Sequence, residues 1–263
     1  MTVPRISTIH RGGSRFYVHP DSGDKVPGVT SVLGMLPKPF LKAWAAKMVA
    51  TSAVESLNGD GTDWLTPMAT GDPDAAIDFL KRAPDRNTRK AADIGTAAHG
   101  VFESLALGNP LGTITPDLEP FARQFEDYLA AVQPKYLRTE DTVWSDKHAY
   151  AGSFDAFAEI QGERCWLDNK TTRSGVYADV ALQLAAYRQA DYLMDGETGE
   201  QLIQPKGDRG LVVHVRPEGW ALYEVPIGDD VFEFFLHLRQ TFTWDRTFSK
   251  GIPGKPLVKG AAK

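Results

Sequence analysis

An acidic and a basic residue stand two positions apart in the heptapeptide WLDNKTT, residues 166–172. Because side chains alternate across a strand, Asp168 and Lys170 are expected on one face. Leu167 and Asn169 are then expected on the other. An isolated Asp-x-Lys pair is common by chance, and taken alone it indicates an ordinary ion pair on a solvated strand. Residues elsewhere in the chain must decide between this interpretation and a catalytic one.

A second carboxylate is predicted to lie beside the first. Asp155 belongs to the segment AGSFDAF, and the short turn at residues 161–163 folds the following strand back on it. Asp155 and Asp168 can therefore become neighbours across the strand pair. Two close carboxylates repel each other unless a cation lies between them, and hard ions such as Mg²⁺ or Mn²⁺ prefer oxygen ligands. A lysine beside such an ion can contact a phosphate or a water.

Three further residues are candidates for the same site. His99, in IGTAAHG, is predicted on a helix among small residues that allow another surface to approach, and neutral imidazole is a good metal ligand. The alternative is a core or helix-surface histidine. Gln183 and Tyr187 are four residues apart and share a helix face, from which they could position a phosphate or a water. A packing face continuous with Val180 and Leu184 is the competing interpretation.

The elements that would position these residues differ between the two halves of the chain. After a short leader, residues 14–33 predict a strand, a turn at Asp-Ser-Gly-Asp and an extended run, which make a small hairpin. Helical periodicity and breakers then predict a mainly helical first half. The predicted helices span residues 41–57, 74–81, 87–107 and 116–132, and the glycines and prolines of residues 58–73 end the first of them.

The second half alternates apolar and polar residues, which predicts strands. The four strand candidates are residues 142–160, 164–172, 210–216 and 220–226, with helices over 177–194 and 229–244. Short turns make the first two and the last two strands antiparallel pairs, and the helix between the pairs predicts a mixed α/β sheet flanked by helices. A single domain over residues 1–263 is expected. Its parts are a hairpin and helical part carrying His99 (1–135), a catalytic sheet core (136–245) and a basic flexible tail (246–263).

Taken together, these motifs resemble the PD-(D/E)xK nucleases of the RecB-like exonuclease group, which includes phage recombination nucleases and relatives linked to CRISPR. That family combines a helical histidine, an aspartate in G-x-x-D, an acid-x-lysine pair and a Q-x-x-x-Y helix. The resemblance runs from about Gly95 to Tyr187, and it is weaker at VPGVTSVLGMLPKPFLKAWAAK. It implies a restriction-endonuclease-like core.

The resemblance also implies a role for each matching residue. It implies that Mg²⁺ or Mn²⁺ is bound by His99, Asp155, Asp168 and the backbone carbonyl of Asn169. Lys170 would act on the attacking water or the scissile phosphate, while Gln183 and Tyr187 would brace the phosphate group. The implied function is a metal-dependent deoxyribonuclease that acts as an exonuclease in phage DNA recombination, repair or processing. DNA is the expected partner, with a phage single-strand annealing or recombination protein as a second, in the cytoplasm of a bacterial host.

Some polar residues are weaker candidates. Thr171, Thr172 and Arg173 follow the lysine directly and could hold a DNA phosphate, with Arg173 the best of them on charge. Five basic residues and one acidic residue make up the charges of residues 81–90, which include Arg89 and Lys90. Glu103 and Glu140 could support the metal ligands, although a plain surface position is the simpler interpretation of each.

Composition excludes some classes of protein. The net charge of -5 argues against a generally basic nucleic-acid binder, although it does not exclude local basic patches. With no apolar run of about 18 residues and no signal-peptide pattern, a soluble intracellular protein without membrane contact is expected. Cys165 is the single cysteine, so a cluster held by four thiolates, as in the CRISPR-associated relatives, is excluded. Its apolar neighbours predict a buried thiol.

Two other functions fit parts of the pattern. One is a DNA-binding or partner-binding module that keeps the nuclease fold without turnover. The other is an unrelated metal hydrolase that acts on small phosphoesters. A phosphate loop of the G-x-x-x-x-G-K-[ST] type is absent from the sequence, so ATP-driven activity would need a partner. Cleavage polarity, strand preference, endonuclease against exonuclease action, the number of metals and the oligomeric state stay open at this level.

Overall fold

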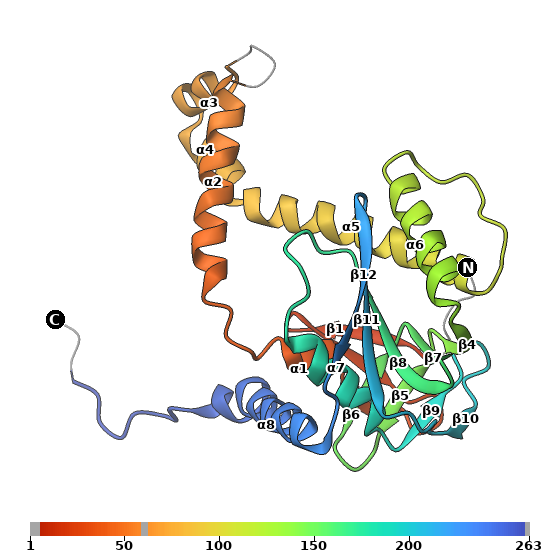
Figure 1. The fold of residues 1–263 in the computed structure, drawn as a ribbon. Helices are drawn as coiled ribbons and strands as arrows, with labels where there is room; N and C mark the ends of the chain where they lie inside the picture. The colour runs from red at the N-terminus through yellow and green to blue at the C-terminus, as the bar shows by residue number, and fades with distance from the viewer. Residues whose placement is uncertain (1–5, 59–62, 261–263) are drawn as a thin grey trace.

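The structure is a computed structural model that describes residues 6–58 and 63–260. The start of the leader, part of the predicted breaker segment 58–73 and the last three residues of the basic tail lie outside the described residues. Three sheets and a set of helices make up the described chain (Figure 1). The strands are β1 (Thr8–Arg11), β2 (Ser14–Val18), β3 (Lys25–Pro27), β4 (Lys135–Thr139), β5 (Thr142–Ser145), β6 (Tyr150–Ser153), β7 (Ala156–Ile160), β8 (Glu163–Lys170), β9 (Tyr192–Met194), β10 (Gln201–Ile203), β11 (Arg209–Arg216) and β12 (Gly219–Val225).

The helices divide into an arm that projects from the sheets and a group that covers them. Helices α2, α3 and α4 form the projecting arm, and α5 runs from the arm back to the core (Figure 1). Helix α8 and the chain after it extend from the core below the arm, in the lower left of the view (Figure 1). The helices are α1 (Val29–Leu33), α2 (Phe40–Asn58), α3 (Leu65–Gly71), α4 (Pro73–Lys81), α5 (Ala83–Ala106), α6 (Glu119–Val132), α7 (Asp179–Arg188), α8 (Asp229–Arg246) and the 3-10 helix η2 (Phe248–Gly251).

The central sheet is mixed and has five strands in the order β12-β11-β8-β7-β4. Strands β7 and β8 are antiparallel, as are β11 and β12, which confirms both predicted hairpins. Strand β8 runs parallel to β11, because the crossover through α7 returns the chain in the same direction. The predicted mixed α/β fold with a helical first half is therefore confirmed.

Each face of the central sheet buries its own apolar cluster. Alternate residues of β8 divide between the faces, with Cys165 and Leu167 packed towards α5 and α6. Trp166 instead packs with the apolar residues of α7 and α8. This alternation puts Asp168 and Lys170 on the α7 side, and it confirms the predicted burial of the Cys165 thiol.

The predicted strand over residues 142–160 is wrong in extent, because the structure divides it into β5, β6 and β7. Strands β5 and β6 belong to a four-stranded sheet of order β10-β9-β5-β6, whereas β7 belongs to the central sheet. The chain passes from one sheet to the other at Phe154 and Asp155. A continuous alternating pattern cannot report such a crossing, because both sheets require the same period of two.

The helix predicted over residues 177–194 is also too long. Helix α7 ends at Arg188, and Tyr192–Met194 forms β9, which is buried throughout and pairs with β5 and β10. Three consecutive buried residues carry no strand period, so local sequence extends the helix through them. Within the predicted extended run, residues 29–33 form α1, and α3 interrupts the predicted breaker segment. Both are short elements whose stability comes from packing rather than propensity.

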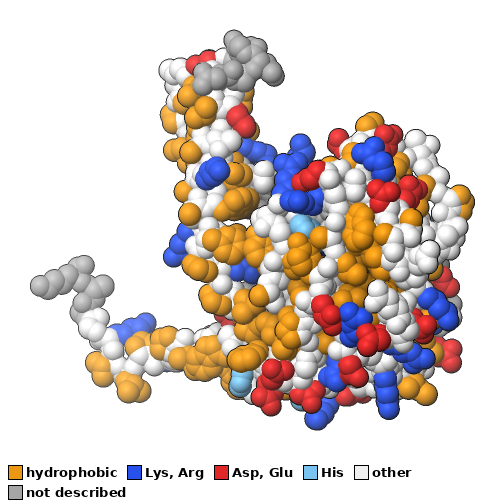
Figure 2. Space-filling model, viewed as in Figure 1, with side chains coloured by type: hydrophobic (Ala, Val, Ile, Leu, Met, Phe, Trp, Pro, Cys, Tyr) orange, Lys and Arg blue, Asp and Glu red, His pale blue; other side chains and the backbone are white. Residues whose placement is uncertain are grey.

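In the described parts of the chain, none of the helices has the length and apolar content needed to cross a membrane. The space-filling view shows hydrophobic side chains at the base of the arm, where it meets the core, and Lys and Arg side chains gathered over the nearby part of α5 (Figure 2). Both features border the region in which the predicted site residues meet.

Candidate functional site

The carboxyl end of β8 carries the first two site residues. Asp168 is 2% exposed, and its Oδ2 atom lies 2.5 Å from Lys170 Nζ. Gln183 Nε2 donates a hydrogen bond of 2.8 Å to the other oxygen, Oδ1. Apart from the ion pair with Lys170, Oδ2 has no hydrogen-bond partner among the described residues. The carboxylate of Asp168 is thus buried and held from two sides.

Asp155 comes to the same place because the chain changes sheets there. The backbone of Phe154 donates to Asp141 O, and Asp155 O accepts from the backbone of Glu140. Asp155 Oδ2 then accepts a hydrogen bond of 2.6 Å from the backbone N–H of Asn169. Asp155 therefore lies beside the end of β8, next to Asp168, as the strand pairing predicts.

Helix α5 supplies the histidine. Its residues Ala98, Val101 and Phe102 are buried in the cluster beneath the central sheet, which fixes the helix against the sheet. His99 lies at the edge of that buried face, and its Nδ1 atom is 3.5 Å from Asp155 Oδ2. His99 thus lies on a helix beside the aspartates, as the sequence predicts.

Helix α7 holds the site together from the other side. Gln183 Nε2 also donates to Tyr187 OH at 3.1 Å, and Tyr187 OH donates to Ser153 O at 2.8 Å. A side chain at Gly152 would prevent this, because an added Cβ would lie 2.7 Å from Tyr187 Cε1. The polar atoms of Gln183 and Tyr187 thus hold Asp168 and the β6 end in place. The two residues also satisfy the packing interpretation, since Tyr187 is 1% exposed.

The two aspartates have opposite pKa shifts. Burial raises the pKa of Asp168 to about 6, and the charge of Asp155 adds to this effect while Lys170 opposes it. Burial acts in the same direction on Asp155, but the hydrogen bond and charge of His99, together with the Asn169 N–H, lower its pKa below the usual value. Asp155 is thus the better stabilised anion of the pair.

The two cationic partners are stabilised in their charged forms. Burial by itself would lower the pKa of Lys170, yet the carboxylate of Asp168 outweighs it and raises that pKa. For His99, likewise, desolvation lowers the pKa, but the hydrogen bond that its ring donates to Asp155 and the charge of that carboxylate raise it overall. Lys170 is consequently an ammonium group at neutral pH and a donor of hydrogen bonds.

Glu140 belongs to this site more clearly than its sequence indicates. The residue has a positive φ of 55° and is exposed at the surface, yet desolvation raises its pKa to about 7, with further contributions from Asp155 and Glu103. The carboxylates of Glu140, Asp155 and Glu103 are therefore close enough beside His99 for their charges to act on one another. Nothing local in the sequence identifies Glu140, because its position depends on the crossing between the sheets.

Two other residues at the site escape sequence reasoning. Tyr17 of β2 is 2% exposed, and its hydroxyl accepts a hydrogen bond from the Ser153 backbone, so the N-terminal sheet reaches the site. His214 of β11 pairs in register with Lys170 of β8. Its Nε2 atom lies 2.7 Å from Thr172 O, where the chain leaves β8. These contacts join residues distant in sequence, so no motif could reveal them.

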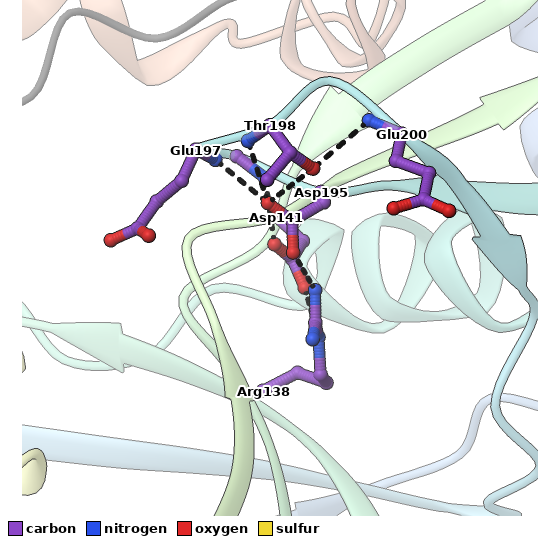
Figure 3. A network of polar contacts seen from close by, with 7 residues as sticks. Arg138, Asp141, Asp195, Glu197, Thr198 and Glu200 are labelled. Carbon is purple, nitrogen blue, oxygen red and sulfur yellow. Dashed lines mark hydrogen bonds and ion pairs between the residues drawn. The ribbon is translucent and has the colours of Figure 1, made fainter.

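A second acidic group lies next to the site, on the other side of Glu140. Asp141 and Asp195 share the guanidinium of Arg138, with contacts of 2.5 and 2.7 Å (Figure 3). Asp195 Oδ1 also accepts from the backbone N–H groups of Glu197 and Thr198 in the β9–β10 turn. We call Arg138, Asp141 and Asp195 the turn network. It fixes Asp141, whose backbone carbonyl accepts a hydrogen bond from the N–H of Phe154, the residue before Asp155.

The residues predicted to contact DNA lie at increasing distances from the site. Thr171 directly follows β8, near Gly95 of α5, and Arg173 is exposed on the loop between β8 and α7. Arg89 and Lys90 line a depression of about 400 Å³ with Arg86. They lie on the same helix as His99, roughly 14 Å further along its axis. The structure does not bring them to the carboxylates.

The donor types of the site fit a divalent cation. Two adjacent carboxylates, an imidazole and a backbone carbonyl are suitable ligands for Mg²⁺ or Mn²⁺. Burial, and after it the charge of Asp155, raises the pKa values of Asp168 and Glu140, and a bound cation would offset both effects. Within residues 6–58 and 63–260, however, no three His, Cys, Asp or Glu side chains form a ready-made metal cluster. In this arrangement Asp168 contacts Lys170 and Gln183, while Asp155 contacts His99 and the Asn169 N–H.

Comparisons with known proteins add little to this description. Neither a protein-family pattern nor a curated protein sequence matches the chain. Among solved structures, the chain is similar to one described as "Crystal structure of SSO0001", with 15% sequence identity and a TM-score of 0.32. The similarity covers 77% of this chain and 85% of that chain. Likeness at this level does not indicate a shared function.

Proposed function

We propose that this protein is a divalent-metal-dependent deoxyribonuclease that hydrolyses phosphodiester bonds. The observation that carries the proposal is the meeting of His99, Asp155, Asp168 and Lys170 at one end of β8, from three separate parts of the chain. An accidental Asp-Lys pair would not require a second, partly buried aspartate and a histidine beside it. In its types of residue and their order, the group agrees with the RecB-like nucleases that the sequence resembles.

In this proposal His99, Asp155, Asp168 and the carbonyl of Asn169 hold one or two Mg²⁺ or Mn²⁺ ions. A bound ion of this kind supplies Lewis-acid chemistry, which favours loss of a proton from water and offsets charge on a phosphate. Gln183 and Tyr187 keep Asp168 oriented through their hydrogen bonds to it and to Ser153. They are positioning residues, because their donors point at protein atoms rather than into solvent.

Lys170 acts as a cation in this mechanism. Its raised pKa keeps the ammonium protonated at neutral pH, so it cannot accept a proton from water in this arrangement. It can instead donate a hydrogen bond to a phosphate oxygen or to the attacking water, which places the two reacting groups together. Exonuclease action, and a partner protein that anneals or recombines single strands, are parts of the proposal that rest on the resemblance alone.

End-labelled oligonucleotides test the proposal. Single-stranded and double-stranded forms are digested with Mg²⁺ or Mn²⁺, and the products are resolved over time. Cleavage by the natural protein and its loss in Lys170→Met are the expected results. Lys147→Met is the matched control, since it removes an exposed lysine in the β5–β6 turn, at the opposite end of β6 from Asp155. Full activity in Lys170→Met would refute the proposed role of this lysine.

A module that binds DNA or a partner without turnover is the second candidate. One observation favours it: Asp155 and Asp168 each already have a protein partner, since Lys170 and Gln183 contact Asp168 and the Asn169 N–H contacts Asp155. That candidate predicts no cleavage with either metal and DNA binding that does not change when metal is added. Metal titration followed by intrinsic fluorescence, together with the digestion, distinguishes it from the nuclease.

A further inference from the structure

Two exposed aromatic rings stack on each other where the arm meets the core. Phe40 begins α2, and Tyr177 lies near the end of the loop between β8 and α7, two residues before Asp179. Their ring planes are 4° from parallel, with the centroids 6.0 Å apart. Despite this contact, Phe40 is 50% exposed and Tyr177 45%. We call this pair the aromatic platform.

The aromatic platform lies close to the candidate active site. The loop that carries Tyr177 begins directly after Lys170, and Asp179 follows two residues after the ring. Asp179 Oδ2 forms an ion pair of 3.3 Å with Lys38 Nζ, which ties the start of α2 to the start of α7. Asp179 also lies near enough to Lys170 for its charge to act on it. Elements on both sides of the platform therefore lead to the lysine proposed to meet phosphate.

The position of the tyrosine ring is fixed before any ligand arrives. Tyr177 OH and Ser174 Oγ are 2.6 Å apart and share a hydrogen bond, while the Phe40 ring covers one side of the tyrosine. A ring held in this way loses little conformational entropy when another flat group stacks on it. Exposure and pre-organisation together suit a binding surface better than they suit a packing contact.

Charge around the platform favours an anionic partner. Arg173, four residues before Tyr177 on the same loop, is exposed. In the described part of the chain, it forms no ion pair. An exposed aromatic stack with a cation on the same loop suits single-stranded nucleic acid, because each base offers a π-face and each linkage a phosphate. An apolar protein partner would gain nothing from this cation.

We propose that Phe40 and Tyr177 form a stacking platform for an unpaired nucleobase of the DNA strand that enters the site. The inference rests on the proposed function, and it adds a substrate class, namely single-stranded DNA or a single-stranded end. Stacking on these rings holds the strand while its backbone passes Lys170. A base inside a duplex keeps both faces covered by its neighbours, and only the end pairs of a blunt duplex offer a free face, so the platform favours an unpaired strand over blunt duplex DNA.

A coupling experiment between ring and base tests the inference. Binding of a labelled single-stranded 12-mer is measured by anisotropy, with Ca²⁺ replacing Mg²⁺ so that no strand is cut. A second set of oligonucleotides carries one abasic site at each position in turn. The proteins are the natural chain, Tyr177→Leu, Phe40→Leu and Tyr177→Trp. Phe234→Leu is the matched control, because Phe234 is 65% exposed on α8 and lies outside the platform.

Tyr177→Leu is expected to weaken binding of the single strand by roughly tenfold, with affinity restored in Tyr177→Trp. One abasic position should weaken binding to the natural chain by a similar factor and have no further effect on Tyr177→Leu. Phe234→Leu should bind as the natural chain does. The inference would be overturned if the Tyr177→Leu change and the abasic site weakened binding independently of each other. It would also be overturned if the ring variants lost as much affinity for a blunt duplex as for a single strand, or if the natural chain did not bind single strands. Melting curves confirm that every variant is folded.

The failure of this inference can be told apart from the failure of the proposed function. A natural chain that never cleaves DNA with Mg²⁺ or Mn²⁺ refutes the nuclease, while the coupling between ring and base still decides the platform. A natural chain that cleaves single strands, with Tyr177→Leu and Phe40→Leu unchanged in KM and in coupling, refutes the platform and leaves the nuclease standing.

Discussion

Two acidic groups lie side by side in this molecule and differ in how their charges are satisfied. In the turn network, each oxygen of Asp195 has donors, since Arg138 contacts Oδ2 and two backbone N–H groups contact Oδ1. At the end of β8, Asp168 is almost completely buried, and its Oδ2 depends on Lys170 alone. Both carboxylate oxygens of Asp195 accept hydrogen bonds, whereas one oxygen of Asp168 has an ion pair and no hydrogen bond.

The pKa shifts express the same difference. The backbone N–H of Thr198, followed by Arg138, lowers the pKa of Asp195 well below its ordinary value. Burial raises the pKa of Asp168 to about 6. A carboxylate that a fold stabilises is part of the structure, while one that a fold tolerates at a cost is a candidate for function. The turn network therefore supports the site, and the site is where chemistry is expected.

Removing the charge of Asp168 should have the largest effect of any change in either group. Asp168→Asn keeps the shape of the side chain but removes a metal ligand, so cleavage should fall by roughly a hundredfold to ten-thousandfold. Its free energy of unfolding should stay the same or increase, because a buried charge is removed. Rates on end-labelled DNA and urea unfolding measure the two effects. An Asp168→Asn variant that is less stable than the natural chain and still cleaves DNA at the natural rate would contradict this assignment of Asp168.

The corresponding change in the turn network should affect stability instead. Asp195→Asn weakens the hydrogen bonds from Arg138 and the turn, which should cost about 1 to 3 kcal/mol of the free energy of unfolding. Cleavage by the folded variant should remain within a few fold. Glu197→Gln is the control, because the turn uses only the backbone of Glu197 and its side chain points away (Figure 3). Equal losses in both variants would contradict the role of Asp195.

A smaller effect is expected from the hydroxyl that links α7 to β6. Tyr187→Phe removes the donor to Ser153 O and the acceptor for Gln183, while the ring continues to fill its buried position. The expected cost is about 1 kcal/mol of stability and a several-fold decrease in kcat, with KM unchanged. Tyr150→Phe, which removes another buried hydroxyl, is a control for stability alone. The comparison fails if both variants lose kcat equally.

The most subtle test is the dependence of stability on pH in the absence of metal. Since the folded pKa of Asp195 is depressed, its contribution is complete above the unfolded pKa and is lost as the pH falls through the folded value. The stability gap between the natural chain and Asp195→Asn should therefore narrow below about pH 4. For Asp168 the folded pKa is raised, so its ionisation destabilises the fold as the pH increases from about 4 to 6. Over that interval the free energy of unfolding of Asp168→Asn should increase relative to that of the natural chain. The differences in stability between the natural chain and the two variants should therefore change in opposite directions with pH, and a change in the same direction would contradict this pair of assignments.

How much of the site could be predicted from sequence depends on the range of the contacts. Asp168 and Lys170 share a face because alternation is a property of one strand, and Gln183 and Tyr187 share a face because a helix turn is local. The pairing of Asp155 with Asp168 followed from a short turn between neighbouring strands. These features were predicted and are present. Their catalytic and metal-binding roles stay predictions.

Longer-range features could not be predicted in the same way. The crossing between sheets at Asp155, the strand Tyr192–Met194 and the position of Glu140 beside His99 all depend on pairing between distant segments. Local propensity could not separate three strands from one, or end α7 at Arg188. The exposed stack of Phe40 on Tyr177 likewise joins two segments far apart in the sequence.

By itself, the sequence determined the helical first half, the mixed sheet of the second half and the residue types of the site, because period and order along the chain are local quantities. Only the tertiary structure decided how the charges of those residues are balanced. Burial raises the pKa of Asp168, and donors from a distant turn lower that of Asp195. Solvation and hydrogen bonding depend on what lies around a carboxylate in space, which is why two aspartates that are alike in sequence differ in the folded protein.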